Sequence, residues 1–415
     1  MCRKRRMESD SSDSSDDYDS DYSESSAGDS SMGSGHSSED EQNRGSSSGM
    51  AIDASNPEEA ADEEEEEEED DLVKAIKREK EKVREHPPDI QCEDYVVDIS
   101  FHPQENILAA GSITGDVLLY KYTNENVEVS ETCELHTKGC RSIQFSEDGN
   151  TIFSCSKDKS IVLTDVKSAK MKKFYDNAHE DAPYCLYVMD ENLFASGDES
   201  GTVKVWDVRR SDPVFSIKET DDYVTSMITN EDKQFLVYSS GEGTITSVNL
   251  RSRKLHLQSE PYEEELNCVG LMRSETKLIT GTSKGKIYIF NWGEFGYHSD
   301  EFPGPKQAIN CLIPVSENIV VTAGEDGLLR ATHLFPHRHL GIVGQHKLNI
   351  EAADISGNGE LLASSSLDHT IKFWNIKYFE DVQVDEKKKA RKKEMNHNLP
   401  SSKFRNSSDF FAGLA

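Results

Sequence analysis

The sequence has no long apolar segment, no paired cysteine motif and little helical periodicity, and each absence excludes a class of protein. No apolar run approaches the roughly 20 residues that a membrane-spanning helix requires, so we expect no membrane association. The eight cysteines include no C-x-x-C pair and no zinc-finger spacing. The first ten residues lack the apolar core of a secretory signal. These absences predict a soluble chain with free thiols in a reducing compartment.

Basic residues are scarce, and the resulting charge is unevenly distributed. The chain has 78 acidic and 46 basic residues and a net charge of −32. Residues 1–71 are net −20 and residues 86–384 are net −19, whereas residues 385–415 are net positive. Nucleic-acid binding draws much of its affinity from Lys and Arg that neutralise phosphates, so the general surface is a poor candidate for binding RNA. We therefore expect RNA contact only through the basic C-terminal tail.

The acidic N-terminal region is rich in serine and has almost no apolar residues. Residues 1–71 cannot bury enough apolar area to offset the entropy of ordering them, so we predict disorder there. Ser14 and Ser37 precede carboxylates in "SSDD" and "SSED", a spacing that suits acid-directed kinases. A phosphorylated regulatory region and an unmodified, solvated tail are both compatible with this pattern.

The rest of the chain divides by composition. Residues 72–85 have the pattern of a short charged helix, which Pro87 and Pro88 end. Residues 86–384 consist of short β-rich runs, and residues 385–415 form a basic tail that we predict to be disordered. The cations of this tail are typical of a nuclear or nucleolar localisation signal, formed by Lys387, Lys388, Lys389, Arg391, Lys392 and Lys393.

The β-rich region contains an internal repeat that is clearest around Trp206. In "SGTVKVWDV" an alternating strand follows a glycine, and equivalent strands recur every 42 residues after a first interval of 44. The equivalent positions are Tyr120, Thr164, Trp206, Val248, Phe290, Thr332 and Trp374. Five of the seven positions that lie five residues upstream are glycine, which is typical of a tight turn with positive φ. Each period has room for about four strands, and seven periods fill residues 86–384.

A repeat of this length with a late Trp-Asp pair resembles the WD-repeat family, whose fold is the β-propeller. The resemblance implies an all-β, seven-bladed WD-repeat β-propeller, with a disordered acidic N-terminal region and a basic C-terminal tail outside it. The seven repeats are expected at about 90–125, 133–170, 176–212, 218–255, 262–296, 305–338 and 344–384. Closing the ring requires one strand from the opposite terminus, and both residues 87–93 and residues 379–384 satisfy that requirement.

The resemblance also implies a structural tetrad of His, Ser or Thr, Asp and Trp within each blade. The seventh repeat has all four members, as His346, Ser364, Asp368 and Trp374. The second repeat has three, with Thr164 in place of Trp, as His136, Ser154 and Asp158. The third repeat has Ser200 in place of Asp, beside His179, Ser196 and Trp206. The sixth repeat keeps only Thr322 and Asp326, and the fourth keeps no member.

The sequence predicts no catalytic, cofactor-binding or metal-binding site. The His, Ser and Asp residues recur at the repeat period, whereas a nucleophile is expected once, so they are better explained as buried polar groups that satisfy one another. Residues 333–340 contain three histidines, but no Cys or carboxylate at a useful spacing, which favours a connection between blades over a metal site. We therefore predict a non-enzymatic interaction platform with no cofactor.

Two functional hypotheses follow from the motifs. The segments "GDESGTVKVWDVR" and "SSSLDHTIKFWNI" and the ending "DFFAGL" resemble a nucleolar branch of the WD-repeat family. That resemblance implies a scaffold in ribosome biogenesis, acting in ribosomal RNA processing and large-subunit assembly. The alternative is a substrate receptor of a cullin–RING ubiquitin ligase, because Trp206, Asp207 and Arg209 match a W-D-x-R adaptor-binding box.

The expected partners are proteins. Acidic rims would attract basic ribosomal proteins or assembly factors, whereas the alternative predicts a ligase adaptor. The candidate rim residues precede a tetrad acid or a first strand, and they are Lys157, Glu325, Leu367, Tyr95 and Tyr223. We expect a monomer within a larger complex, located in the nucleus and nucleolus, with the cytoplasm as a further compartment.

Overall fold

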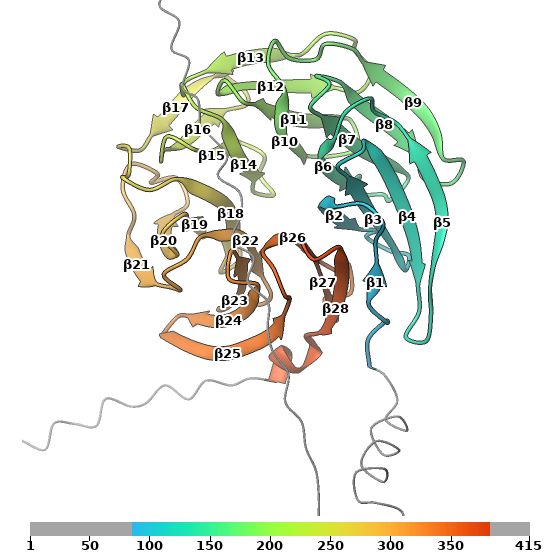
Figure 1. Cartoon of the computed structure of the whole chain (residues 1–415). Helices are drawn as coiled ribbons and strands as arrows, with labels where there is room; N and C mark the ends of the chain where they lie inside the picture. Colours follow the sequence, from blue (N-terminus) through green and yellow to red (C-terminus); the bar gives the residue numbers. More distant parts are fainter. Residues whose placement is uncertain (1–84, 382–415) are drawn as a thin grey trace, which may run out of the picture. The chain divides into compact units, whose positions relative to one another are not determined.

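The computed structural model describes residues 85–381, which form a β-propeller (Figure 1). This part of the chain contains 28 strands and one 3-10 helix, and none of its helices is long and apolar enough to cross a membrane. The predictions for residues 1–71, for the helix up to residue 84 and for the tail at 385–415 lie outside the described residues. The same holds for Ser14, Ser37 and the tail's cation cluster, so these remain predictions.

Seven antiparallel sheets of four strands surround a central axis, and each sheet is one blade (Figure 1). The prediction of a seven-bladed propeller is thereby confirmed. Blade 1 consists of β2 (Val96–Phe101), β3 (Ile107–Ser112), β4 (Asp116–Tyr122) and β5 (Val127–Glu134). Blade 2 consists of β6 (Cys140–Phe145), β7 (Thr151–Ser156), β8 (Ile161–Asp165) and β9 (Lys170–Tyr175). Blade 3 consists of β10 (Pro183–Val188), β11 (Leu193–Asp198), β12 (Thr202–Asp207) and β13 (Phe215–Lys218).

Blades 4 to 6 repeat this arrangement, with the chain again running from the innermost to the outermost strand. Blade 4 consists of β14 (Val224–Thr229), β15 (Phe235–Ser240), β16 (Ile245–Asn249) and β17 (Lys254–Gln258). Blade 5 consists of β18 (Leu266–Met272), β19 (Lys277–Thr282), β20 (Lys286–Asn291) and β21 (Asp300–Pro303). Blade 6 consists of β22 (Ile309–Pro314), β23 (Ile319–Gly324), β24 (Leu328–Leu334) and β25 (His337–Gln345). Blade 7 contains β26 (Ile350–Ile355), β27 (Leu361–Ser366) and β28 (Thr370–Asn375).

The fourth strand of blade 7 comes from the N-terminal side of the domain. The strand β1 (Ile90–Gln91) pairs with β28, with Ile90 opposite Ile371 and Gln91 opposite Thr370. Of the two segments that the sequence allowed, residues 87–93 therefore close the ring, while a 3-10 helix spans Lys377–Asp381. The pairing cannot extend far on its N-terminal side, because Pro87 and Pro88 lie just before Asp89 and have no N–H to donate.

The second strand of each blade is buried on both faces, because neighbouring blades cover it from either side. In β3 all six residues of "ILAAGS" are buried, whereas in the outer strand β5 nearly all residues are exposed or half-buried. A continuous apolar run without alternation is the pattern that two-sided burial requires. The core thus lies in the spaces between blades rather than along the central axis.

The inner strands are joined around the axis by hydrogen bonds from a side chain of one blade to the backbone of the next. Each of the seven blade boundaries has at least one such interblade bond. They link Asp98 to Ile143, Gln144 to Val188, Tyr187 to Thr229, Thr225 to Leu266, Asn267 to Ile309, Asn310 to Ile350, and Asp354 to Phe101. The last of these joins blade 7 to blade 1, beside the closure made by β1.

The predicted positive φ of the repeated glycine turn is confirmed. Gly201 and Gly285 have φ values of +84° and +81°, and a Cβ on Gly285 would meet the carbonyl oxygen of Pro305. Lys159 and His369, which replace the glycine in the second and seventh repeats, also have positive φ. The turn geometry is therefore maintained in every blade, at a conformational cost where glycine is absent.

One expected connection between blades is instead a hairpin within a blade. Residues 333–340 include the end of β24 and the start of β25, which pair in blade 6 with Leu334 opposite His337. The Nδ1 atom of His333 lies 2.9 Å from the carbonyl oxygen of Pro336, which keeps the turn tight. The interpretation failed because a proline in this segment suggested irregular structure, whereas here it occupies the two-residue turn itself.

Candidate functional site

One face of the propeller is defined by a hydrogen bond that recurs in all seven blades. The residue after each second strand donates its N–H to the carbonyl of the residue just before the blade's first strand. We call this the upper face. The donor and acceptor pairs are Ile113 and Tyr95, Lys157 and Gly139, Glu199 and Ala182, Gly241 and Tyr223, Ser283 and Glu265, Glu325 and Ala308, and Leu367 and Asn349.

All five rim residues predicted from the sequence lie on this upper face. Lys157, Glu325 and Leu367 are donors in the recurring bond, while Tyr95 and Tyr223 are acceptors. The structure thus places both predicted groups on one face, although the five residues belong to five different blades. Their role in binding remains a prediction.

Aromatic and charged side chains surround the upper mouth of the central channel. The rings of Tyr184 and Tyr223 lie 5.0 Å apart, and the guanidinium of Arg141 lies 5.3 Å from the Tyr184 ring. Arg141 also forms an ion pair with Glu199 at 2.9 Å, and the Tyr223 hydroxyl donates to Glu265 at 3.2 Å. Arg141, Tyr184, Tyr223 and Glu265 line a cavity of about 440 Å³. The mouth therefore offers flat apolar rings edged by carboxylates.

Burial and nearby carboxylates keep the mouth tyrosines protonated. Burial raises the pKa of Tyr223, and the negative charge of Glu265 raises it further. Burial raises the pKa of Tyr95 in the same way, and Glu351 adds to the effect. Both hydroxyls therefore act as hydrogen-bond donors at neutral pH, and neither is poised as a base or a nucleophile.

The upper face of blades 3 to 5 carries a concentration of exposed carboxylates, which we call the acidic sector. Among the described residues, the only ion pair made by its members joins Glu199 to Arg141. The neighbouring upper turns of blades 2, 6 and 7 present the exposed cations Lys138, Lys306 and Lys347. The acidic sector consists of Glu199, Glu219, Asp221, Asp222, Glu242, Glu263 and Glu265.

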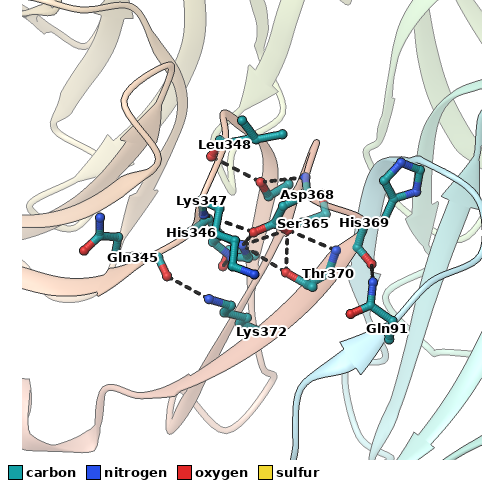
Figure 2. Close-up of polar contacts among 12 residues, drawn as sticks. Gln91, Gln345, His346, Lys347, Leu348, Ser365, Asp368, His369, Thr370 and Lys372 are labelled. Carbon is teal, nitrogen blue, oxygen red and sulfur yellow. Dashed lines mark hydrogen bonds and ion pairs between the residues drawn. The ribbon is translucent and has the colours of Figure 1, made fainter. Parts of the chain in front are cut away.

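The structure brings the four predicted tetrad residues of blade 7 within hydrogen-bond distance of one another, and Figure 2 shows the part around His346 and Asp368. The Ser364 hydroxyl lies 2.8 Å from Nε2 of His346 and accepts the Trp374 indole N–H at 2.9 Å. Nδ1 of His346 lies 3.3 Å from Asp368, which also accepts the N–H of Lys347. Burial would raise the pKa of Asp368, but these hydrogen bonds and that from Thr370 outweigh it and lower the pKa to about 2.

Blade 2 keeps the histidine and serine of the tetrad but connects them differently. His136 lies 2.9 Å from Ser154 through Nε2 and 2.8 Å from Ser160 through Nδ1. Ser160 in turn donates to Asp158 at 2.6 Å, whereas the direct distance from His136 to Asp158 is 3.6 Å. Thr164 cannot replace the indole donor, and its hydroxyl has no hydrogen-bond partner among the described residues.

In blade 3 the tetrad acid is Asp198, which corrects the assignment of Ser200 to that position. Nδ1 of His179 lies 3.0 Å from Asp198, and Nε2 lies 2.6 Å from Ser196, which accepts the Trp206 indole N–H at 2.8 Å. Ser200 donates its hydroxyl to Asp198 at 2.8 Å. Blade 3 thus exchanges the serine and the aspartate that blade 7 has at Ser366 and Asp368, and the carboxylate still reaches the imidazole.

Because Asp198 and not Ser200 contacts His179, we predict that replacing the two residues has unequal effects on stability. Replacing Asp198 by alanine leaves the buried Nδ1 of His179 without its acceptor, and we expect a loss of about 2 kcal/mol in the free energy of unfolding. Replacing Ser200 by alanine removes only a partner of Asp198, and we expect about 0.5 kcal/mol. Urea unfolding of both variants measures the difference. Equal losses of unfolding free energy in the two variants would show that Asp198 is no more important to the tetrad than Ser200.

Comparison with known proteins identifies the family of this propeller. Residues 87–379 match the WDR55 family model. The chain belongs to the WDR55 family. It is 51% identical over 345 residues to the WD repeat-containing protein 55 homolog of Aedes aegypti, covering 83% of this chain and 74% of that one. It is 53% identical over 346 residues to the Drosophila willistoni homolog, covering 83% and 68%.

The W-D-x-R segment of this WDR55 chain presents one of its three candidate residues. Trp206 is buried at 3% exposure, and Asp207 is buried beneath Arg209, whose guanidinium binds it at 2.6 and 2.8 Å. The Arg209 side chain itself is 71% exposed. Trp206 is therefore a structural residue of blade 3, and an adaptor could reach Arg209 alone without local rearrangement.

Sequence reasoning missed two residues at the channel mouth of this WDR55 propeller. Arg141 and Tyr184 are the second residues of β6 and β10, at the β-bulge of each strand, and their side chains line the cavity. The sequence did contain a signal for them. The second residue of the first strand is also large and polar in blade 7, where it is Glu351 of β26. Reading that one position across all repeats would have identified the residues that line the mouth.

Proposed function

We propose that this chain is a non-enzymatic scaffold whose acidic sector and tyrosine-lined mouth bind basic proteins during ribosome biogenesis. Membership of the WDR55 family supports a WD-repeat scaffold. The observation that carries the binding proposal is the acidic sector itself, where exposed carboxylates adjoin the half-buried rings of Tyr184 and Tyr223. Lysine- and arginine-rich proteins would match both the charge and the flat aromatic surfaces.

The assignment to ribosomal RNA processing and large-subunit assembly rests on the resemblance of "GDESGTVKVWDVR", "SSSLDHTIKFWNI" and "DFFAGL" to a nucleolar branch of the WD-repeat family. Ribosomal proteins and many of their assembly factors are basic, which agrees with a propeller of net negative charge. Nuclear and nucleolar localisation through the cation cluster from Lys387 to Lys393 belongs to the same proposal.

The proposal predicts capture of basic partners that is sensitive to salt. We expect the full-length chain to recover large-subunit precursors and basic assembly proteins at about 100 mM salt, and about tenfold less at about 400 mM. Reversing three carboxylates of the acidic sector, as Asp221→Lys, Asp222→Lys and Glu242→Lys, should reduce recovery at low salt to a similar extent. Affinity purification with quantitative mass spectrometry measures both effects.

A matched control separates the site from the net charge. The variant Glu125→Lys, Glu131→Lys and Glu134→Lys alters exposed carboxylates of blade 1 by the same total charge, and it should recover partners at the wild-type level. If both variants lose partners equally, or if recovery does not depend on salt, the acidic sector is not the binding surface. Recovery of a ligase adaptor in place of ribosomal precursors would favour the alternative function.

A further inference from the structure

The face opposite the upper face is defined by a second recurring hydrogen bond. The last residue of each third strand, or the residue after it, donates its N–H to the turn that joins the first and second strands. We call this the lower face. Examples are Val166 to Asn150 at 3.1 Å, Val208 to Asn192 at 2.8 Å and Leu250 to Gln234 at 3.0 Å. The turns between third and fourth strands are therefore at equivalent places in each blade, near the outer edge of the propeller.

Three consecutive blades present a cation at the same position of this lower turn. Lys167, Arg209 and Arg251 each follow the donor of the recurring bond in blades 2, 3 and 4. Further cations lie beside them, in the same turns or at the start of the fourth strand. We call the whole set the basic arc, and its exposed members are Lys167, Lys170, Arg209, Arg210, Arg251, Arg253 and Lys254.

The basic arc contrasts with the charge of the rest of the chain. The equivalent positions in blades 1, 5 and 6 are Thr123, Gly293 and Phe335. Blade 7 has a cation there, Lys377, which forms an ion pair with Glu360 and is separated from the arc by these other blades. Adjacent blades therefore share the cation only in blades 2 to 4. On its inner side, turns between first and second strands carry the exposed acids Glu147, Glu191 and Glu231. A polyanion would therefore be attracted to the outer edge and repelled from the channel.

Most cations of the arc have no acidic partner of their own. Arg209 is held by Asp207, and Arg253 approaches the carbonyl oxygen of Val214 at 3.5 Å. Within residues 85–381, the remaining five members form no ion pair. Solvated, unpaired cations in a row are available to neutralise phosphates without first losing an internal contact.

An aromatic groove lies between the first two blades of the arc. It has a volume of about 360 Å³, and its apolar lining includes Phe174, Tyr175 and Pro213. Its charged lining residues are Lys173, Lys204, Asp176 and Asp212. The Phe174 side chain is 48% exposed, and the neighbouring Met171 is 50% exposed. Lys173 holds one wall in place, because its Nζ donates to the carbonyl oxygens of Val208 and Arg210. These bonds fix the backbone of Arg210, which precedes the lining residue Ser211.

We propose that the basic arc binds single-stranded RNA, with phosphates on its cations and a base stacked on Phe174. The outer strands β9, β13 and β17 lie on successive blades along the rim (Figure 1), so an extended strand can follow the arc from blade to blade. An exposed aromatic ring between cations is the combination that binds single strands without sequence preference. An acidic protein segment would use the cations but offers no regularly spaced planar bases to stack on the half-exposed ring.

This inference goes beyond the proposed function and does not rest on it. The acidic sector and the basic arc occupy opposite faces, so RNA on the lower face and basic protein on the upper face do not compete for the same surface. It also revises the expectation that RNA contact is limited to the C-terminal tail. Failure of RNA binding at the arc would leave protein capture by the acidic sector unaffected, and the reverse also holds.

Fluorescence anisotropy with a labelled single-stranded RNA of about 15 nucleotides tests the proposal on the full-length chain. We expect Lys167→Glu, Arg210→Glu and Arg251→Glu together to weaken binding at least about tenfold and to reduce the slope of log affinity against log salt by about 2. The control Lys138→Glu, Lys306→Glu and Lys347→Glu makes the same charge change on the upper face and should retain wild-type binding.

Two further variants separate the contributions. Phe174→Ala should weaken binding about tenfold while leaving the salt slope unchanged, because it removes stacking and no charge. Neutralising the cations from Lys387 to Lys393 with glutamine removes binding by the tail and should leave the arc's contribution measurable. Equal binding by the wild-type chain and the arc variant, equal loss in the upper-face control, or binding of a polyglutamate peptide but not of RNA would each overturn the assignment.

Discussion

Replacing Trp206 by alanine is expected to lower the free energy of unfolding by about 4 kcal/mol. The indole is almost fully buried, stacks on Phe194 with ring centroids 6.0 Å apart and packs against Tyr175 at 5.1 Å. Its loss leaves a large cavity and also removes the N–H that Ser196 accepts. Guanidinium unfolding followed by far-ultraviolet circular dichroism measures the change.

The conservative variant Trp206→Phe divides this effect into two parts. Phenylalanine fills most of the cavity but cannot donate to Ser196, so we expect a loss of about 1 to 2 kcal/mol. If Trp206→Ala costs no more than Trp206→Phe, the indole is not the packing centre of blade 3. A loss of protein binding by the phenylalanine variant, at unchanged stability, would give Trp206 a direct functional role that its burial argues against.

The second large effect is a pH dependence that Asp354 introduces at the boundary between blades 7 and 1. Its carboxylate accepts the N–H groups of Phe101 at 2.7 Å and Ile355 at 2.8 Å. Burial raises its pKa to about 7, although these hydrogen bonds act in the opposite direction, and the nearby charge of Asp98 raises it further. The unfolded-state pKa of an aspartate is about 3.9.

A folded-state pKa above the unfolded-state value means that the folded chain binds this proton more tightly. The contribution of Asp354 to stability is therefore largest at low pH and is lost as pH rises toward the folded-state pKa. We expect the wild-type chain to gain about 2 kcal/mol relative to Asp354→Asn when pH falls from 8 to 5. Unfolding curves of both chains at the two pH values measure this difference.

The comparison with Asp354→Asn cancels the titration of the other groups. Burial lowers the pKa values of His136, His179 and His346, so these histidines lower stability in the same range as pH falls. They are present in both chains and do not affect the difference. The exposed Asp232→Asn serves as the control and should follow the wild type at both pH values. Parallel curves for wild type and Asp354→Asn would show that this carboxyl does not titrate in the folded chain.

The architecture could be read from the sequence because a propeller repeats one environment seven times. The spacing from Gly201 to Trp206 recurs often enough to fix the turn, the third strand and the number of blades without knowledge of any contact. The closing strand could not be chosen in this way. Residues 87–93 and 379–384 are both short and partly apolar, and the choice depends on which of them pairs with the one edge of β28 that β27 leaves open.

The remaining errors arise where function or stability depends on a side chain's direction rather than on its place in the repeat. Ser200 occupies the aligned position of the tetrad acid, but Asp198 lies two residues earlier and still faces His179 across the turn. The basic arc was also hidden, because charge was summed along the chain, where Lys167 and Arg251 are far apart. Only the fold places them at equivalent points of neighbouring blades.

The closure of blade 7 by β1 has a consequence for the order in which the chain folds during synthesis. Ile90 leaves the ribosome early, yet its partner Ile371 is made some 280 residues later. During translation at about 5–20 residues per second, the first six blades can form from their own consecutive strands while β1 waits without a partner. The ring becomes continuous only when nearly the whole domain has emerged, so truncation before β28 leaves an open stack of blades with unpaired edges at both ends.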